Sequence, residues 1–329
     1  MEIKYLPYED RFFEDIRRIT LTSFELTAFG TDGRIPREKA LEIAWEAWCR
    51  PVLVSDKKKY CVMACTPRKA VGFIIYGANA EFSRLLDIKI GSIILMAVEK
   101  KYRGRYRIAR HLLEYVFNIY KNNKVNLITV GTDQDNLPAV MSYIHSGFEP
   151  VLNWSTFRYY FKEDREYEDT DGTLVKTEKA DIRFQSLPSR PVPYLCDNKL
   201  TRQQKNALLR YIIKKIKLEI NGGRLEYYHI RKDSQTAGYL TLMRDKAISE
   251  VLRKSFYRIN DLVFPGRDED MNSRLLCSSL SALKKLHPSM DSLEIFIRSN
   301  DWPMIHILNH SGFTLVHNAM NLHCHLPML

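Results

Sequence analysis

Apolar and polar positions along the chain follow two periods, which predict a regular succession of strands and helices. Short apolar runs rich in β-branched and aromatic residues predict strands over residues 3–6, 60–65, 71–76, 90–98, 126–130 and 154–161. Apolar residues at helical spacing predict helices over residues 12–24, 36–48, 108–120 and 138–145. The nearly unbroken run 90–98 is typical of a central strand. The order β-α-α-β-β-β-α-β-α-β therefore indicates an α/β fold, which some schemes class as α+β.

The second half of the chain repeats the first at an offset of 165 residues. The segment DNLPAVMSYIHSGF at 135–148 recurs as NDWPMIHILNHSGF at 300–313, with five identical residues in register. At this offset, counterparts of the strand near 97 and the helix near 112 fall at 261–264 and 276–283, after a strand pair at 225–230 and 238–243. The repeat predicts two tandem domains, each a mixed central sheet flanked by helices. Their expected bounds are 1–162 and 181–329, joined by a polar linker or surface hairpin at 163–180.

Composition excludes several classes of protein. With 329 residues, 45% of them hydrophobic and 27% charged, the chain can form two ordinary cores and is not disordered or fibrous. It has no apolar stretch long enough for a membrane span, and its first residues carry acids rather than an apolar signal region. The six cysteines form no CxxC pair, so we expect reduced thiols. A cytoplasmic protein with no membrane partner is predicted.

The net charge of +11 favours an anionic ligand or partner. Residues 1–170 carry 26 basic and 23 acidic side chains, and residues 171–329 carry 24 and 16, so the surplus lies mainly in the second half. In the first half, cations concentrate in one loop between the strand 90–98 and the helix 108–120. A helix start after a strand attracts anions because its first amides lack intrahelical partners, and a pyrophosphate suits such a site.

The residues around this loop resemble those of the GNAT family of acyl-CoA-dependent N-acetyltransferases. The resemblance rests on YRG at 102–104, IAR at 108–110, LLE at 112–114 and the pattern N-x-x-A-x-x-x-Y-x-x-x-G-F at 136–148. It covers residues 1–162 and, in a degraded form, about 181–329. It implies two tandem GNAT-like domains, with acetyl-CoA as the acyl donor and no metal.

The resemblance also implies roles for particular residues. The strand that offers backbone groups to the pantetheine arm contains Leu95, Met96, Ala97 and Val98. The loop that holds the pyrophosphate contains Arg103, Gly104, Arg105, Tyr106, Arg107, Ile108, Ala109 and Arg110. Asn136 would lie beside the pantetheine, and Tyr143 would protonate the departing thiolate, which a phenol with a pKa near 10 can do. Asn136 as a plain helix cap and Tyr143 as a packing residue are the structural alternatives.

The sequence departs from the family pattern at two positions in the first copy. Arg107 stands where the phosphate loop usually has a glycine. Ser92 stands where some members have a glutamate base, so the amine proton would pass to water or to another acid, or the amine would arrive neutral. The other acids that could take this proton are Glu81, Asp87 and Glu99.

The second copy departs further. Asp268, Glu269 and Asp270 occupy the place of the cationic loop, where they would repel a pyrophosphate. Asp301 replaces Asn136 and Leu308 replaces Tyr143, so we expect a second domain that keeps the fold without the catalysis.

Histidines near the C-terminus offer an alternative reading as a metal site. His306 and His310 are four residues apart, and His323 and His325 follow. Since His310 corresponds to His145 in a copy that lacks the other ligands, a structural role is favoured and no metal is expected.

The sequence predicts an acetyltransferase that transfers the acetyl group of acetyl-CoA directly to an amine of a small-molecule or peptide acceptor. The alternative is a non-catalytic tandem GNAT module that senses CoA or a nucleotide, or binds an anionic polymer. A third reading resembles tandem-GNAT aminoacyltransferases that use charged tRNA, although nucleic acid is not the expected partner. The sequence is also compatible with a homodimer.

Overall fold

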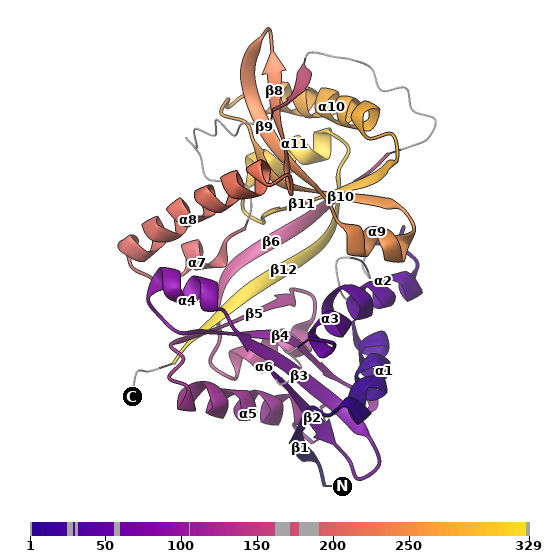
Figure 1. The fold of residues 1–329 in the computed structure, drawn as a ribbon, viewed down its shortest axis with the longest axis vertical. Helices are drawn as coiled ribbons and strands as arrows, with labels where there is room; N and C mark the ends of the chain where they lie inside the picture. Colours follow the sequence, from indigo (N-terminus) through magenta and orange to yellow (C-terminus); the bar gives the residue numbers. More distant parts are fainter. Residues whose placement is uncertain are drawn as a thin grey trace. The chain divides into compact units, whose positions relative to one another are not determined.

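The computed structural model describes residues 2–24, 29, 32–55, 60–104, 106–161, 172–177 and 191–326 (Figure 1). The chain divides into two compact units, each built from segments that are distant in sequence. Unit 1 comprises Met1–Leu152, Cys196–Gln204 and Ala319–Leu329. Unit 2 comprises Asn153–Leu195 and Lys205–Asn318.

Unit 1 contains a mixed sheet in the order β1-β2-β3-β4-β5-β12. The strands are β1 (Lys4–Pro7), β2 (Cys61–Cys65), β3 (Ala70–Ala78), β4 (Ile90–Val98), β5 (Leu127–Asp133) and the last part of β12 (Thr314–His325). Neighbouring strands run antiparallel, except that β4 and β5 are parallel. The helices are η1 (Asp10–Phe12), α1 (Phe13–Ser23), α2 (Arg37–Ile43), the π-helix η2 (Ala44–Cys49), α3 (Arg50–Leu53), α4 (Ala80–Leu86), η4 (Lys100–Tyr102), α5 (Ile108–Asn122) and α6 (Leu137–Ile144).

The sheet of unit 1 has an apolar core on each face. Strand alternation sends Val62 and Ala64 into the core under α5, and Cys61 and Met63 into the core under α1. Figure 1 shows α1 and α5 on opposite sides of these strands. Ile16, on α1, is fully buried, and such burial contributes about 1.5–3 kcal/mol per large aliphatic side chain.

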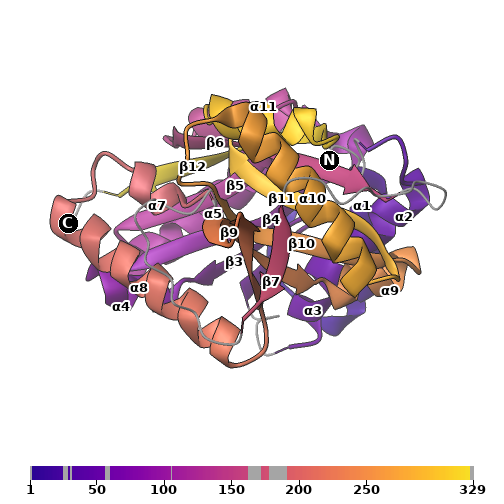
Figure 2. The same ribbon diagram turned by 90° about the horizontal axis from the view of Figure 1, so that it is seen from above.

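Unit 2 repeats this plan with a sheet in the order β6-β11-β10-β9-β8-β7. Its strands are β6 (Glu149–Tyr160, from residue 153 onward), β7 (Thr173–Lys176), β8 (Glu226–Lys232), β9 (Gln235–Arg244), β10 (Ser255–Val263) and β11 (Met290–Arg298). Its helices are α7 (Pro193–Cys196), α8 (Arg202–Asn221), α9 (Lys246–Leu252), α10 (Glu269–Leu286) and α11 (Trp302–His310). Figure 2 shows α8 and α10 on opposite sides of β9. The tandem mixed α/β fold expected from the repeat is confirmed.

Two parts of the chain differ from the sequence interpretation. The short helix α4 was not expected; Asn79 begins it by accepting a hydrogen bond from the Phe82 amide at 3.2 Å. The segment 163–180, interpreted as a linker or surface hairpin, supplies β7, which pairs with β8. Residues 163–171 and 178–180 of that segment lie outside the described part of the chain.

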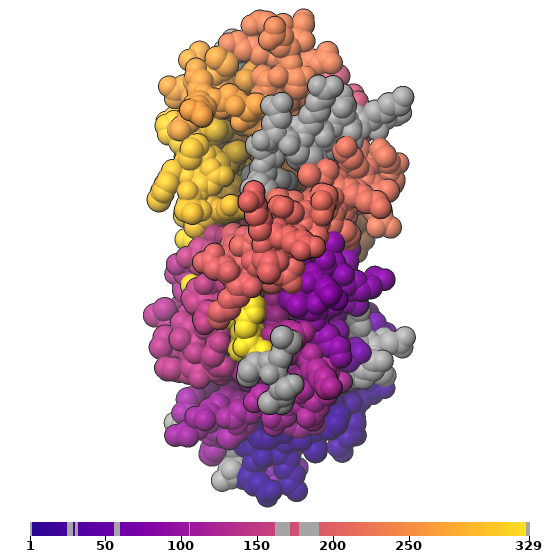
Figure 3. All heavy atoms as spheres, turned by 90° about the vertical axis from the view of Figure 1, so that its left-hand side faces the viewer, coloured from indigo at the N-terminus to yellow at the C-terminus, as the bar shows by residue number. Residues whose placement is uncertain are grey.

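The closing strand of each sheet comes from the other repeat. The sequence places 154–161 at the end of the first copy, but Trp154–Tyr160 pairs with β11 in unit 2. In return, Ala319–His325 pairs with β5 in unit 1. Yellow atoms from the C-terminal end of the chain accordingly emerge among the purple and magenta atoms of unit 1 (Figure 3).

A buried ion pair accompanies this exchange. In unit 2, Arg158 faces Glu294 with 2.5 Å between Nη2 and Oε2, and neither side chain has any exposed surface. In unit 1, the corresponding pair one repeat away is His323 and Thr129. Without the exchange Arg158 would face Thr129, leaving a buried guanidinium without a carboxylate, which is strongly unfavourable.

No helix in the described ranges is both long and apolar enough to cross a bilayer.

Breaking the buried pair should destabilise unit 2. We expect Glu294→Gln to lower the free energy of unfolding by about 3–5 kcal/mol, because it leaves the charge of Arg158 uncompensated. Replacing both residues, as Arg158→Met with Glu294→Leu, should recover much of that loss. Urea unfolding of the wild type, Arg158→Met, Glu294→Leu and the double variant completes a double-mutant cycle that measures the coupling. As a control, breaking the exposed pair of Glu46 and Arg50 should cost less than about 1 kcal/mol.

Candidate active site

The central parallel strands of unit 1 pair over only part of their length. The register of β4 and β5 runs from Ile90 opposite Leu127 to Ile93 opposite Val130. On its other side β4 stays paired with β3 as far as Val98, with a bulge at Ile94 that shifts the register. The last part of β4 therefore has β3 on one side and is parted from β5 on the other, so its backbone can bind an extended ligand.

Tyr120 contacts β3 and β4 close to the point where β4 parts from β5. Its hydroxyl is within hydrogen-bond distance of the amides and carbonyls of Gly77 and Ser92, at 2.9–3.2 Å. The hydroxyl thus takes part in the ladder between β3 and β4. A β-carbon on Gly91 would lie 2.6 Å from Cζ of Tyr120, so a glycine is needed for the ring to lie there. The sequence interpretation missed both residues, because neither belongs to a motif that contacts ligand.

A cationic turn follows β4 and leads into α5. Gly104 has φ of +71°, and Arg107, the N-cap of α5, has φ of +49°. Arg107 thus adopts the left-handed backbone that a glycine accommodates best, at the position where the family pattern has glycine. Its side chain does not cap the helix, whereas Asn136 caps α6 and Asn79 caps α4 through their side chains. The first amides of α5 are therefore available to an anion.

The expected phosphate-binding residues divide by environment. Tyr106, Arg107 and Arg110 are exposed, Ala109 is half-buried, and Ile108 is buried in the core under α5. Arg103 donates from Nε to the carbonyl of Val98 at 2.8 Å, which ties the turn to the end of β4. Arg110 donates to Glu114 at 2.7 Å. Arg105 lies outside the described residues.

The four strand residues expected to contact pantetheine lie on the parted section of β4. Leu95 and Met96 are half-buried, and Ala97 and Val98 are buried. All four pair with β3, so this section of β4 is hydrogen-bonded on one side and parted from β5 on the other.

The two remaining expected site residues lie on α6 or cap it. Asn136 caps the helix by accepting from the Ala139 amide at 3.4 Å, as its structural alternative supposed. Tyr143 is only 5% exposed and its ring lies 5.5 Å from that of Phe148. Burial raises the pKa of Tyr143, and the nearby Asp133 raises it further. The phenol is therefore protonated at neutral pH.

Neither Ser92 nor Glu99 is a ready base. The Ser92 hydroxyl is 3.0 Å from that of Thr129. Glu99 is bound by Arg18 at 2.8 Å and Lys69 at 2.7 Å. Burial opposes its charge, but the hydrogen bonds from Lys69 and Arg18 prevail and lower the pKa of Glu99. Glu99 thus connects the turn to α1 and to Lys69, which immediately precedes β3.

The matching helix start in unit 2 has the opposite chemistry. Asp268 caps α10 by accepting from the Met271 amide at 2.9 Å, and Glu269 and Asp270 occupy the first turn. A carboxylate of the chain itself thus binds the amides that remain available in α5. Asp301 caps α11, and Leu308 is fully buried in the core.

The C-terminal histidines form two separate groups. His306 and His310 stack on α11 with ring centroids 3.9 Å apart, in unit 2. His323 and His325 lie in unit 1, where they meet Asp197. The sequence interpretation considered all four histidines together and missed Asp197, since nothing in the local sequence around it indicates its partners.

Residues 13–148 match the family model for the acetyltransferase (GNAT) family. The chain therefore contains a GNAT domain. This domain includes the parted strands, the cationic turn and α6. The family membership inferred from the motifs of the first repeat is thus confirmed.

Two solved structures are similar to nearly the whole chain. A GCN5-related N-acetyltransferase from Sphaerobacter thermophilus is 10% identical, has a TM-score of 0.58, and aligns over 99% of this chain and 97% of its own. A tandem GNAT protein from the clavulanic acid biosynthesis pathway is 12% identical, has a TM-score of 0.51, and aligns over 98% of each chain. At such identities the likeness shows the fold, so the GNAT fold extends over both units. No curated protein matches the sequence.

Removing the Tyr120 hydroxyl should weaken the ladder between β3 and β4. We expect Tyr120→Phe to lower the free energy of unfolding by about 1–3 kcal/mol, because buried backbone groups lose a partner. Gly91→Ala should have a similar effect by forcing the ring away. Urea unfolding measures both changes. Tyr115→Phe, on the same helix, is the control and should change stability by less than about 0.5 kcal/mol.

A substitution at Arg107, whose backbone is left-handed, should have the opposite effect on stability. Arg107→Gly should raise the free energy of unfolding by up to about 1 kcal/mol, because the strain of a side chain at positive φ disappears. Gly104→Ala should lower it by about as much. Gly33→Ala, at a residue with open space around it and no positive φ, is the matched control. A destabilised Arg107→Gly protein would contradict the assignment of strain.

Proposed function

We propose that unit 1 transfers the acetyl group of acetyl-CoA directly to an amine of a small-molecule or peptide acceptor. One observation carries the proposal: the basic, uncapped start of α5 follows β4 just after β4 has parted from β5. An extended thioester can then pair with the strand while its anionic end reaches the helix amides.

The pantetheine arm is proposed to lie along the parted section of β4. Leu95, Met96 and Ala97 would offer backbone groups to its amides, and Val98, whose carbonyl binds Arg103, marks the end of this section. Asn136 uses its Oδ1 to cap α6, which leaves its amide nitrogen as a donor to pantetheine.

The pyrophosphate is proposed to bind at the cationic turn. Backbone amides of Ile108, Ala109 and Arg110 would donate to its oxygens, because the start of α5 carries no capping side chain. The guanidinium groups would add attraction that salt weakens, since they are exposed. The proposed phosphate-binding residues are Arg103, Gly104, Arg105, Tyr106, Arg107, Ile108, Ala109 and Arg110.

The transfer itself moves one acyl group and one proton. The acceptor nitrogen attacks the thioester carbonyl, the carbon–sulfur bond breaks, and the nitrogen loses a proton while the sulfur gains one. Tyr143 is proposed as the donor to sulfur, because its phenol is protonated at neutral pH and therefore has a proton to give to the departing thiolate. Since Ser92 and Glu99 are engaged elsewhere, the acceptor amine is proposed to bind neutral or to release its proton to water.

Unit 2 is proposed to lack this activity. The carboxylate of Asp268 accepts from the Met271 amide and places a negative charge at the start of α10, where it would repel phosphate, and Leu308 supplies no proton.

Binding of acetyl-CoA tests the site directly. Calorimetric titration of the full chain should give one site in unit 1, weakened at least tenfold in the double variant Arg107→Glu with Arg110→Glu, because carboxylates would then repel the pyrophosphate. Lys246→Glu with Lys254→Glu makes the same charge change at two exposed residues of unit 2 and should leave affinity unchanged. Absence of binding at millimolar acetyl-CoA would refute the proposal.

Turnover tests the role of Tyr143. With labelled acetyl-CoA and a panel of amines, Tyr143→Phe should lower kcat by about 10²–10⁴-fold, the usual contribution of a general acid, without weakening acetyl-CoA binding. Tyr257→Phe removes a buried phenol hydroxyl from unit 2 and should not change kcat. Binding of CoA without transfer to any amine would instead support a sensor.

A further inference from the structure

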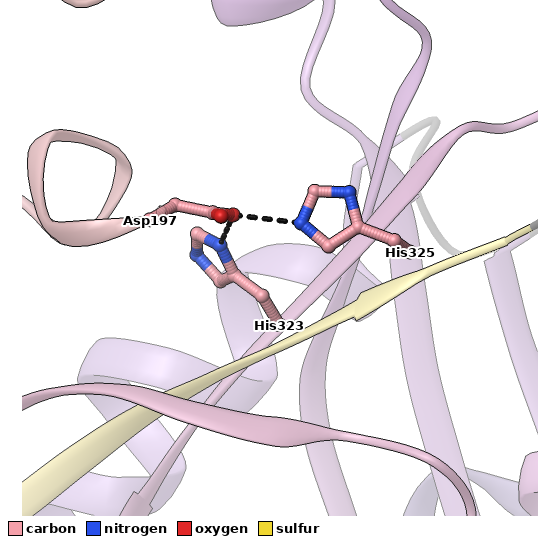
Figure 4. A group of neighbouring side chains, drawn as sticks. All are labelled: Asp197, His323 and His325. Carbon is pink, nitrogen blue, oxygen red and sulfur yellow. Dashed lines mark hydrogen bonds and ion pairs between the residues drawn. The ribbon is translucent and has the colours of Figure 1, made fainter. Parts of the chain in front are cut away.

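Three side chains of the kinds that bind metal ions meet in unit 1 (Figure 4). Asp197 follows the short helix α7, and His323 and His325 lie on β12. Alternate residues of a strand point to the same face, so both imidazoles reach the carboxylate. Cys324, between them, points to the opposite face and packs in the core under α5.

The three side chains converge on one point. Oδ2 of Asp197 is 2.5 Å from Nδ1 of His323 and 2.8 Å from Nε2 of His325. One ligand atom from each residue lies within 4.8 Å of the other two. Figure 4 shows both rings directed at the carboxylate.

The surroundings resemble the support that metal ligands need. The Lys199 amide donates to Oδ1 of Asp197 at 2.8 Å, which fixes the carboxylate and leaves Oδ2 to face the imidazoles. Asp197 and His323 are almost fully buried, at 2% and 1% exposed. The His325 side chain is 24% exposed, so an ion and a water can enter from its side.

We propose that Asp197, His323 and His325 bind a divalent transition metal ion of the zinc class. Two imidazole nitrogens and one carboxylate oxygen form a ligand set that suits zinc, with a water completing a tetrahedron. Each imidazole would carry its proton on the far nitrogen, so that the near lone pair binds the ion and no redox change is involved.

The fit requires a small local movement. Zinc lies about 2.0–2.2 Å from nitrogen and oxygen ligands, so tetrahedral ligand atoms are about 3.4 Å apart. The present separations of 2.5 and 2.8 Å must therefore open by less than about 1 Å. The partly exposed His325, at the end of β12, can open the 2.8 Å separation, and small rotations of the Asp197 and His323 side chains would open the 2.5 Å one.

The ion would join the loop at Asp197 to the strand that completes the sheet of unit 1. Ala319–His325 pairs with β5 at the edge of that sheet. A metal that binds only the folded state stabilises it by an amount that grows with the logarithm of the free metal concentration above the dissociation constant, so the ion would add to the stability of unit 1.

The test uses full-length, tag-free protein that has been treated with a chelator and then dialysed. Titration with ZnCl₂ should show one tight site, and saturating zinc should raise the melting temperature by several degrees. Cobalt(II) should give the visible absorption of a tetrahedral site. A missing cobalt band together with an unchanged melting temperature would overturn the proposal.

Variants assign the ligands. Asp197→Asn can keep the hydrogen bonds to both imidazoles after a change of tautomer, so it should fold yet lose the metal. Asp197→Asn and His325→Gln should each weaken zinc binding by about 100-fold or more, since loss of a mere supporting residue already costs 10–100-fold. His310→Gln, in the stacked pair on α11, should bind zinc normally. Loss of binding in His310→Gln with retention in Asp197→Asn would refute the site.

Discussion

Arg158 and Glu294 meet inside the sheet of unit 2 with no exposed surface, and the path of the whole chain depends on that meeting. Arg258 donates to the second oxygen of the same carboxylate at 2.9 Å, so the buried acid is bound on both sides. Such a group is costly to bury alone and tolerable only when each charge has its partner. The pair therefore acts mainly on specificity, since it favours one of two closing strands that are otherwise similar.

The two units show how the same backbone gains or loses an anion site. In both repeats a strand leads through a short turn into a long helix, and the amides at its start need acceptors. In α10 the carboxylate of Asp268 meets that need from within the chain, whereas Arg107 at the start of α5 does not. A change of one capping residue, with its neighbours, thus decides whether the amides at the helix start stay available to an external anion or meet a carboxylate of the chain itself.

The sequence predicted what depends on local pattern. The periodicity located most strands and helices, the repeat HSGF indicated two copies, and the motifs at 102–114 and 136–148 indicated the family. The exchange of closing strands was not predictable, because both strands carry a similar alternation and the residue that distinguishes them, Arg158, has its partner Glu294 136 residues further along the chain. Asp197 was missed for the same reason, because its partner His323 lies 126 residues further along the chain. The close contact of the Tyr120 ring with Gly91 was also not predictable, because it depends on side-chain packing and not on a sequence motif.

The exchange also bears on how the protein can evolve. After duplication, each copy came to hold a strand that the other requires, so neither copy can be deleted without opening a sheet edge in its neighbour. A second copy of this kind is kept even when a carboxylate of the chain caps its own helix start. Selection on the first copy alone is enough to preserve β12, because β12 completes the sheet of unit 1. The part of the second copy that leads to β12 is preserved with it.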